Sequence, residues 1–421
     1  MSRESITYFG AGPAGLPTTV LETVAAALVN YKSLGLGIAE ISHRSKDAEE
    51  ILNSCKKDLR TYLGVPDEFE VLFMQGGGTG QFSATIYEFV SLWVERRRKA
   101  IAEKKKDEEE VQRELEKEVE ELKIDYLVTG GWSLKASQEA ARLVGDEHVN
   151  IVTDARKING GKFGKIPEEE DWKISKNAAM VYYCDNETVD GVEFPTFPAI
   201  LKNGGGEDEP LVVADMSSNI LSRPIPFEQF SAVFFGAQKN LGCAGLTVVI
   251  IKRCLLAPTA GRADPKIMRK LGLPIGPIAL SYDIVSKNNS LYNTLSITDV
   301  FLAGQVLKKA LNTFGEERVG GQMKVSGEKA EKIYGVLDKR SERYSVVANK
   351  GARSRMNICF RILDDEGKVS EELEAKFVKD AAAEGLTGLK GHRSVGGIRA
   401  SNYNSVSFEG ATKLAEFLEQ F

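Results

Sequence analysis

Short apolar runs alternate along the chain with segments of helical character, and this alternation constrains the fold more than any other feature. The runs are FEVLFMQ (69–75), DYLVTGG (125–131), AAMVYYC (178–184), PLVVADMS (210–217), AVFFGA (232–237) and LTVVIIK (246–252). Their length and β-rich composition predict buried strands, and the helical segments between them predict a largely parallel sheet with helices on both faces. We therefore expect an α/β fold.

The chain has 421 residues, which is enough for two domains. Gly315, Gly320 and Gly321 mark a joint after the helical segment that begins near Phe301. We expect a large domain over residues 16–315 and a smaller α/β domain, with its own sheet, formed by residues 316–421 together with residues 1–15.

Residues 95–124 depart from this pattern because they are strongly charged and carry few apolar positions. Lys and Glu side chains spaced four apart support a solvated helix or helical hairpin. A partner-binding arm is the alternative, and nothing in the residues favours it.

Composition excludes several classes of function. The formal net charge of -5 is small for this length and argues against a general affinity for nucleic acid. The five cysteines form no CxxC pair, so neither a zinc site nor a disulfide framework is indicated. The chain shows no targeting sequence and no run of about 18 apolar residues. We expect a cytosolic protein without a bound metal or membrane contact.

A glycine-rich turn, Gly76–Gly80, follows the first predicted strand and opens a helix. Glycines let backbone N–H groups approach an anion, and a helix N-terminus adds unpaired donors and a favourable dipole. The turn is therefore a candidate phosphate site, although it lacks the Gly-Lys-Ser/Thr of a P-loop and the GxGxxG spacing. A turn without a ligand remains the alternative.

Asp215 and Lys239 each follow an apolar run at the point where a strand should end. The carboxyl ends of parallel strands line the ligand crevice of an α/β sheet. Asp215 alone fits a helix N-cap equally well. Together with the glycine turn, however, the two residues suggest pyridoxal phosphate, which needs an amine for a Schiff base, a carboxylate beside its ring nitrogen and a phosphate cradle.

Two of the three histidines are followed by arginine, in EISHRS (His43, Arg44) and in KGHRSVGGIRAS (His392, Arg393), and Arg399 lies six residues after the second pair. Arginine offers a planar fork for carboxylate or phosphate. These pairs are candidate anion sites, with ordinary surface residues as the alternative.

These motifs resemble the class-V, fold-type I aminotransferases that use pyridoxal phosphate, and in particular the phosphoserine aminotransferase family. The similarity rests on FGAGPAGLP, AEISHRS, GGGTGQF, YYCDNETVDG, VVADMSS, GAQKNLGCAGLTVVI, YNT, SRMN and GHRSVGGIRAS, in order from residue 9 onward. The resemblance implies reversible transamination between L-glutamate and 3-phosphohydroxypyruvate, which gives 2-oxoglutarate and O-phospho-L-serine. It also implies a homodimer with shared active sites.

The resemblance implies roles for individual residues. Lys239 would form the Schiff base and Asp215 would pair with the ring nitrogen. Asn293 and Thr294 would reach the cofactor phosphate of the neighbouring subunit. The other expected cofactor contacts are Gly78, Thr79, Trp132, Thr188 and Gln238. Arg399 would bind the substrate α-carboxylate, and the distal anion would be received by His43, Arg44, His392 and Arg393.

Thr79 departs from the resemblance, because many bacterial members carry arginine there. Other class-V enzymes of the serine– or alanine–glyoxylate type remain an alternative, although their substrates lack the distal anion that the His-Arg pairs would bind. A cysteine desulfurase would need a reactive cysteine in the small domain, where only Cys359 lies, in a run typical of a buried strand. A catalytically silent scaffold is the non-enzymatic alternative.

Overall fold

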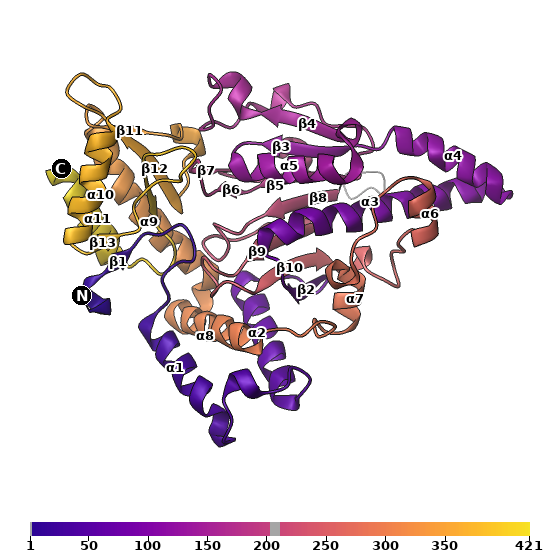
Figure 1. Ribbon diagram of the computed structural model, residues 1–421, viewed down its shortest axis with the longest axis horizontal. Helices are drawn as coiled ribbons and strands as arrows, with labels where there is room; N and C mark the ends of the chain where they lie inside the picture. The colour runs from indigo at the N-terminus through magenta and orange to yellow at the C-terminus, as the bar shows by residue number, and fades with distance from the viewer. Residues whose placement is uncertain (1, 203–210) are drawn as a thin grey trace.

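The computed structural model describes residues 2–202 and 211–421, and its centre is a seven-stranded sheet (Figure 1). The strand order is β2-β10-β9-β8-β5-β3-β4. The bounds are β2 (Phe69–Met74), β3 (Ile124–Val128), β4 (Val149–Asp154), β5 (Met180–Cys184), β8 (Leu211–Asp215), β9 (Ala232–Gly236) and β10 (Thr247–Lys252). All six predicted runs form strands of this sheet; Pro210, the first residue of one run, lies outside the described residues.

The sheet is mostly parallel, as expected, but β10 runs antiparallel to both of its neighbours. Strands β9, β8, β5, β3 and β4 pair in parallel. Strand β4 was not among the predicted runs. It lies at the sheet edge and four of its six residues are only partly buried, so its sequence lacks the continuous apolar run of the central strands.

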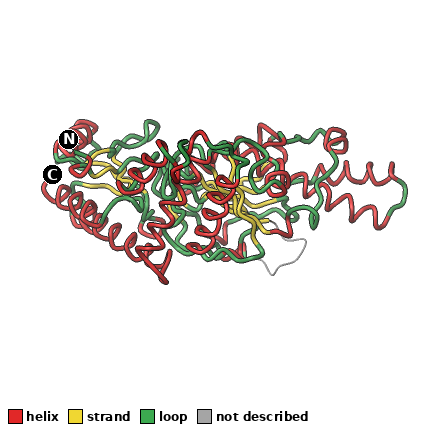
Figure 2. Tube along the Cα trace, turned by 90° about the horizontal axis from the view of Figure 1, so that it is seen from below, coloured by secondary structure: helices red, strands yellow, loops and turns green. Residues whose placement is uncertain are grey.

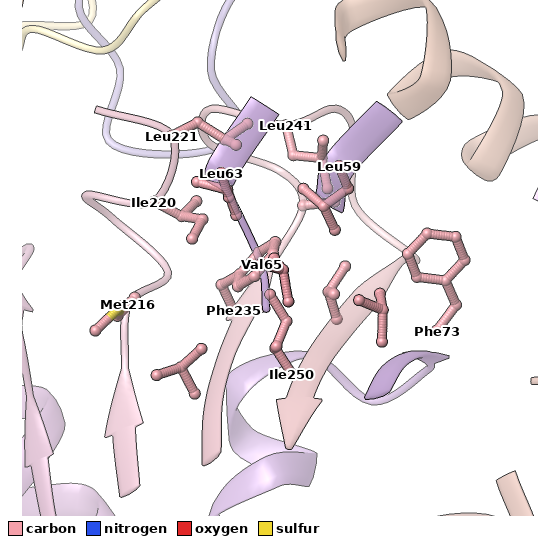
Figure 3. Packing of buried hydrophobic residues seen from close by; sticks show 14 of the residues in the cluster. Leu59, Leu63, Val65, Phe73, Met216, Ile220, Leu221, Phe235, Leu241 and Ile250 are labelled. Carbon is pink, nitrogen blue, oxygen red and sulfur yellow. The ribbon is translucent and has the colours of Figure 1, made fainter. Parts of the chain in front are cut away.

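Helices cover both faces of the sheet (Figure 1). On one face, α2 (Lys46–Leu63) and α8 (Ile297–Phe314) pack over a cluster that includes Leu59, Phe73 and Phe235, seen in Figure 3. On the other face, α3 (Gly77–Lys104) and α5 (Gly131–Val144) close a second cluster. The remaining helices of this part are α1 (Thr18–Val29), α6 (Pro265–Lys270) and α7 (Tyr282–Lys287). Burial on both faces explains why the central strands are apolar throughout.

The charged segment forms a helical hairpin that we call the arm, made of the end of α3 and of α4 (Glu108–Glu120). It projects from the body at the end opposite the C-terminal part (Figures 1 and 2). Its seam is a short row of buried side chains, Ile101, Leu115, Val119 and Leu122. Two ion pairs cross it, Arg97–Glu118 at 3.6 Å and Lys105–Glu114 at 3.9 Å. The predicted solvated hairpin is confirmed.

The C-terminal part carries its own three-stranded sheet with helices against it. Its elements are α9 (Arg318–Lys339), β11 (Tyr344–Val346), β12 (Asn357–Ile362), α10 (Glu371–Ala383), β13 (Leu386–Thr387), β14 (Ile398–Ser401) and α11 (Phe408–Gln420). Near the N-terminus, β1 (Thr7–Tyr8) pairs in parallel with β13, so the chain begins against its own C-terminal part. Within the described residues, no helix has both the length and the apolar character needed to cross a bilayer.

Direct hydrogen bonds join the C-terminal part to the loops at the strand ends of the large sheet. Arg355 donates to Glu193 at 2.8 Å, and the backbone of Asn404 donates to the side chain of Asn240 at 2.9 Å. Asn240 directly follows Lys239 in the chain. The loops that carry the candidate site are therefore anchored by the strands of the large sheet and by hydrogen bonds to the C-terminal part.

Candidate functional site

Lys239 and Asp215 lie at the carboxyl ends of the neighbouring parallel strands β9 and β8. Both are buried, at 9% and 8% exposed. The Lys239 amine donates a hydrogen bond to Thr188 Oγ1 at 2.7 Å. Burial lowers the pKa of Lys239 to about 8, and the negative charge of Asp215 partly opposes that shift. A neutral amine is therefore accessible near physiological pH.

The Asp215 carboxylate is fixed by Ser217, whose backbone N–H and hydroxyl donate to Oδ1 at 2.8 and 2.6 Å. Burial raises the pKa of Asp215, whereas the Ser217 bonds and the nearby Lys239 ammonium lower it. Its other oxygen, Oδ2, lies 3.5 Å from where a side chain on Gly78 would begin. The Asp215 carboxylate therefore lies directly beside the glycine turn.

The glycine turn bends at Gly76 and Gly77, with φ of 103° and 64°, so left-handed backbone at both positions favours glycine. Helix α3 begins at Gly77, whose N–H is held by Thr247 Oγ1 at 2.9 Å. The next N–H groups, those of Gly78 and Thr79, belong to the first turn of the helix and have no i−4 carbonyl to bond. The Thr79 side chain is exposed. The turn presents donors suited to a phosphate.

Trp132 occupies the first turn of α5, half-buried beside Phe82, with ring centroids 6.4 Å apart. Its indole Nε1 is buried and has no hydrogen-bond partner among the described residues. A buried donor without a partner is costly, and a ligand acceptor would remove that cost. Lys135, one turn along, holds its ammonium 4.4 Å from the centre of the Trp132 ring.

Arg399, on β14 of the C-terminal part, donates to the backbone oxygen of Thr188 at 3.2 Å. Thr188 therefore contacts the amine of Lys239 through its hydroxyl and the guanidinium of Arg399 through its carbonyl. Gln238 lies beside this group, and its backbone oxygen accepts from Ala14 at 2.8 Å. The structure thus brings Lys239 and Arg399 to Thr188, and it places Asp215 within electrostatic reach of Lys239 and beside Gly78.

The two His-Arg pairs lie in different parts of the fold's element order. His43 and Arg44 form a turn just before α2, whereas His392 and Arg393 lie in the loop between β13 and β14. Among the described residues, no hydrogen bond or ion pair links the pairs, and His43 Nε2 is buried without a partner. Burial lowers the pKa of His392, as do the charges of Arg399, Lys135 and Arg393. His392 therefore lies within electrostatic reach of Arg399 and Lys135, whereas the Arg393 side chain is exposed.

Asn293 and Thr294 are exposed in the loop before α8 and contact Gln75 of their own chain. The Asn293 amide donates to Gln75 Oε1, and Gln75 Nε2 donates to the Thr294 carbonyl at 3.3 Å. Because Gln75 directly precedes Gly76, the two residues lie next to the glycine turn. Their predicted contact with a neighbouring subunit remains a prediction.

Sequence reasoning missed three residues of the site, Glu187, Asp190 and Lys135. The Glu187 carboxylate accepts from the backbone of Trp132 and Ser133 at 2.9 and 2.8 Å, and Asp190 accepts from Gly131 at 2.8 Å. Burial raises the pKa of Glu187 to about 7 and that of Asp190 to about 6. Both acids stand in the NETVDG motif, but their contacts with α5, more than 50 residues earlier, have no local signal.

Cys359 lies in β12, fully surrounded, and its thiol donates to the Val189 carbonyl at 3.5 Å. Burial raises the pKa of Cys359 to about 12. A thiol so protonated is a poor nucleophile, which weighs against a cysteine desulfurase.

The residues assembled around Thr188 fit a pyridoxal phosphate cofactor. They supply a buried amine of lowered pKa and a fixed carboxylate. Within the described part of the chain, they also supply a helix N-terminus whose Gly78 and Thr79 N–H groups have no acceptor and an indole N–H without a partner. An anionic cofactor that carries an aldehyde and a ring nitrogen can use each of these groups.

The family model described as class-V aminotransferase matches residues 6–107 and 115–414, and its internal gap lies in the arm. The match covers nearly the whole chain, so the chain belongs to the class-V aminotransferases. It is 42% identical over 426 aligned residues to a phosphoserine aminotransferase of Saccharomyces cerevisiae, which covers 100% of this chain and 98% of the relative.

Solved structures agree with that relationship. The chain matches phosphoserine aminotransferase from Bacillus circulans subsp. alkalophilus with a TM-score of 0.79 and 35% identity, covering 98% of this chain and 97% of that one. It matches phosphoserine aminotransferase with bound PLP from Trichomonas vaginalis with a TM-score of 0.78 and 33% identity, covering 98% and 99%. Within the class-V enzymes, the chain falls among the phosphoserine aminotransferases.

Proposed function

We propose that the protein catalyses reversible transamination between L-glutamate and 3-phosphohydroxypyruvate, which yields 2-oxoglutarate and O-phospho-L-serine for serine biosynthesis. The observation that carries the proposal is the buried Lys239 amine, with a pKa lowered to about 8, beside the fixed Asp215 carboxylate. Full-length similarity to phosphoserine aminotransferases supports the substrate assignment.

Lys239 acts on the substrate α-proton. Pyridoxal phosphate, when bound, supplies an electron sink for negative charge at the substrate α-carbon. The neutral Nζ of Lys239 takes the α-proton as general base and later gives a proton back as general acid. Asp215 would keep the cofactor ring nitrogen protonated. The other residues that would hold the cofactor are Gly78, Thr79, Trp132, Thr188 and Gln238.

Cationic side chains would recognise the anionic groups of the substrates. Arg399 would bind the α-carboxylate that both substrates share, because its guanidinium already lies against Thr188 beside Lys239. His392 and Arg393 would receive the distal anion, phosphate in one substrate and carboxylate in the other. One cationic pocket can therefore serve both half-reactions.

We also propose that the enzyme is a homodimer with shared sites. Asn293 and Thr294 would reach the cofactor phosphate of the partner, and His43 and Arg44 would complete the partner's distal-anion pocket. The two His-Arg pairs lie on different elements, with no hydrogen bond or ion pair between them among the described residues, and this supports the arrangement. So does an exposed apolar patch close to the first pair in sequence, formed by Leu28, Val29, Leu34 and Leu36 at 46%, 79%, 49% and 50% exposed. All five cysteines are free, which supports a reducing compartment such as the cytosol.

The decisive experiment is a coupled assay with phosphoserine and 2-oxoglutarate on the purified protein and on Lys239→Ala. We expect turnover and a visible cofactor band that shifts on addition of glutamate in the parent protein, and neither in the variant. Lys350→Ala is the matched control, because that side chain is 82% exposed and its ammonium lies 4.0 Å from Asp338, outside the proposed site. An active, coloured Lys239→Ala protein would refute the proposal.

A further inference from the structure

The loop between β5 and β8 contains a small hairpin, β6 (Asn186–Glu187) and β7 (Val192–Glu193), whose side chains reach several parts of the site. Glu187 is fully buried and uses both of its carboxylate oxygens. Oε2 accepts from the Trp132 N–H at 2.9 Å. Oε1 accepts from the N–H and the hydroxyl of Ser133 at 2.8 and 2.6 Å.

These bonds replace the cap that helix α5 lacks. Its N-cap is Gly130, which has no side chain to accept a hydrogen bond from the first turn. Glu187 supplies the missing acceptors from a distant segment, and its charge suits the positive end of the helix dipole. A side chain on Gly130 would begin 2.4 Å from Glu187, so glycine at this position admits the carboxylate.

The same hairpin also contacts Lys239 and Arg399. The next residue, Thr188, accepts from Lys239 through its hydroxyl and from Arg399 through its carbonyl. The position of Trp132 is thereby coupled through one peptide unit to the lysine amine.

We propose that Glu187 is a positioning residue that fixes the Trp132 ring relative to Thr188 and Lys239, and thereby tunes the affinity for pyridoxal phosphate. This inference rests on the proposed function, in which Trp132 would hold the cofactor. Glu187 touches neither the substrate nor the cofactor in this role. It acts through Trp132.

The test variant is Glu187→Gln. Glutamine has the same shape, but it offers one acceptor oxygen where the carboxylate offers two, so its NH2 group must face a donor of Trp132 or Ser133. We expect the dissociation constant for pyridoxal phosphate, measured by equilibrium dialysis on the cofactor-free protein, to rise about tenfold. Quenching of tryptophan fluorescence by the bound cofactor should weaken in parallel.

Asp125→Asn is the matched control. Asp125 is also fully buried, and its carboxylate accepts from the N–H and hydroxyl of Ser175 and from the Asn150 amide at 2.6–2.9 Å. It is the second residue of β3, near the amino end of that strand, whereas the site lies at the carboxyl ends of the parallel strands. We expect both Asp125→Asn and Glu187→Gln to lower the unfolding temperature, because each leaves a buried donor poorly satisfied. Asp125→Asn should leave the cofactor affinity unchanged.

A double-mutant cycle with Trp132→Leu tests whether Glu187→Gln weakens cofactor binding through Trp132. If Glu187 acts through Trp132, adding Glu187→Gln to Trp132→Leu should weaken binding no further. Additive losses in the double variant would overturn the inference, as would an unchanged affinity in Glu187→Gln or an equal loss in Asp125→Asn. If Trp132→Leu alone left the affinity unchanged, the proposed role of Trp132 in holding the cofactor would fail, and this inference with it.

Discussion

Replacing Lys239 by methionine should abolish activity and yet make the cofactor-free protein more stable near neutral pH. Methionine is similar in length and carries no charge, so it fills the same buried space without the cost of desolvating an ammonium. In the unfolded chain, the lysine is protonated up to its ordinary pKa of 10.5. In the folded chain, burial lowers the pKa to about 8.

The magnitude follows from this difference. At about 1.4 kcal/mol per pH unit, a pKa lowered from 10.5 to about 8 costs the folded state about 3 kcal/mol at pH 7. Methionine recovers that cost but leaves Thr188 Oγ1 without its donor, a loss of about 1 kcal/mol. We expect Lys239→Met to raise the free energy of unfolding by about 2 kcal/mol at pH 7.

The pH dependence identifies the cause. Between the two pKa values the unfolded state holds more protons than the folded state, so the stability of the parent protein rises with pH across this window. The advantage of Lys239→Met should therefore shrink from about 2 kcal/mol at pH 7 to near zero at about pH 9.5. Urea denaturation of both cofactor-free proteins at the two pH values measures this difference in the free energy of unfolding. A difference that does not change with pH, or a less stable variant at pH 7, would refute the reasoning.

Two further predictions concern recognition and assembly. Arg393→Gln should raise the KM for phosphoserine about tenfold or more while changing that for alanine little, because only phosphoserine carries a distal anion; equal changes in steady-state kinetics would contradict a distal-anion contact. If the protein is the proposed homodimer, Val29→Asp should dissociate it and lower turnover, because Val29 is 79% exposed and stands in the apolar patch. Sedimentation that finds the parent protein monomeric, or the variant still dimeric and active, would count against the shared site.

The positions of Lys239, Asp215 and the glycine turn could be predicted because their signals are local. Each follows an apolar run, and side chains at the carboxyl ends of parallel strands meet at one edge of the sheet. The direction of strand β10 was harder to predict, since the apolar run 246–252 has the same composition whether it runs parallel or antiparallel to β9. Its direction depends on a connection too short for a parallel crossover. Edge strand β4 escaped detection because partial burial tolerates polar residues.

The sequence by itself determined the α/β class, the charged hairpin and the kinds of chemistry available, because apolar periodicity and glycine turns act over a few residues. The tertiary structure decided which groups meet. Lys239 contacts Thr188 across 51 positions, Arg399 reaches the same residue across 211, and Glu187 caps a helix more than 50 residues earlier. Such contacts depend on how whole layers pack, and packing depends on many residues at once.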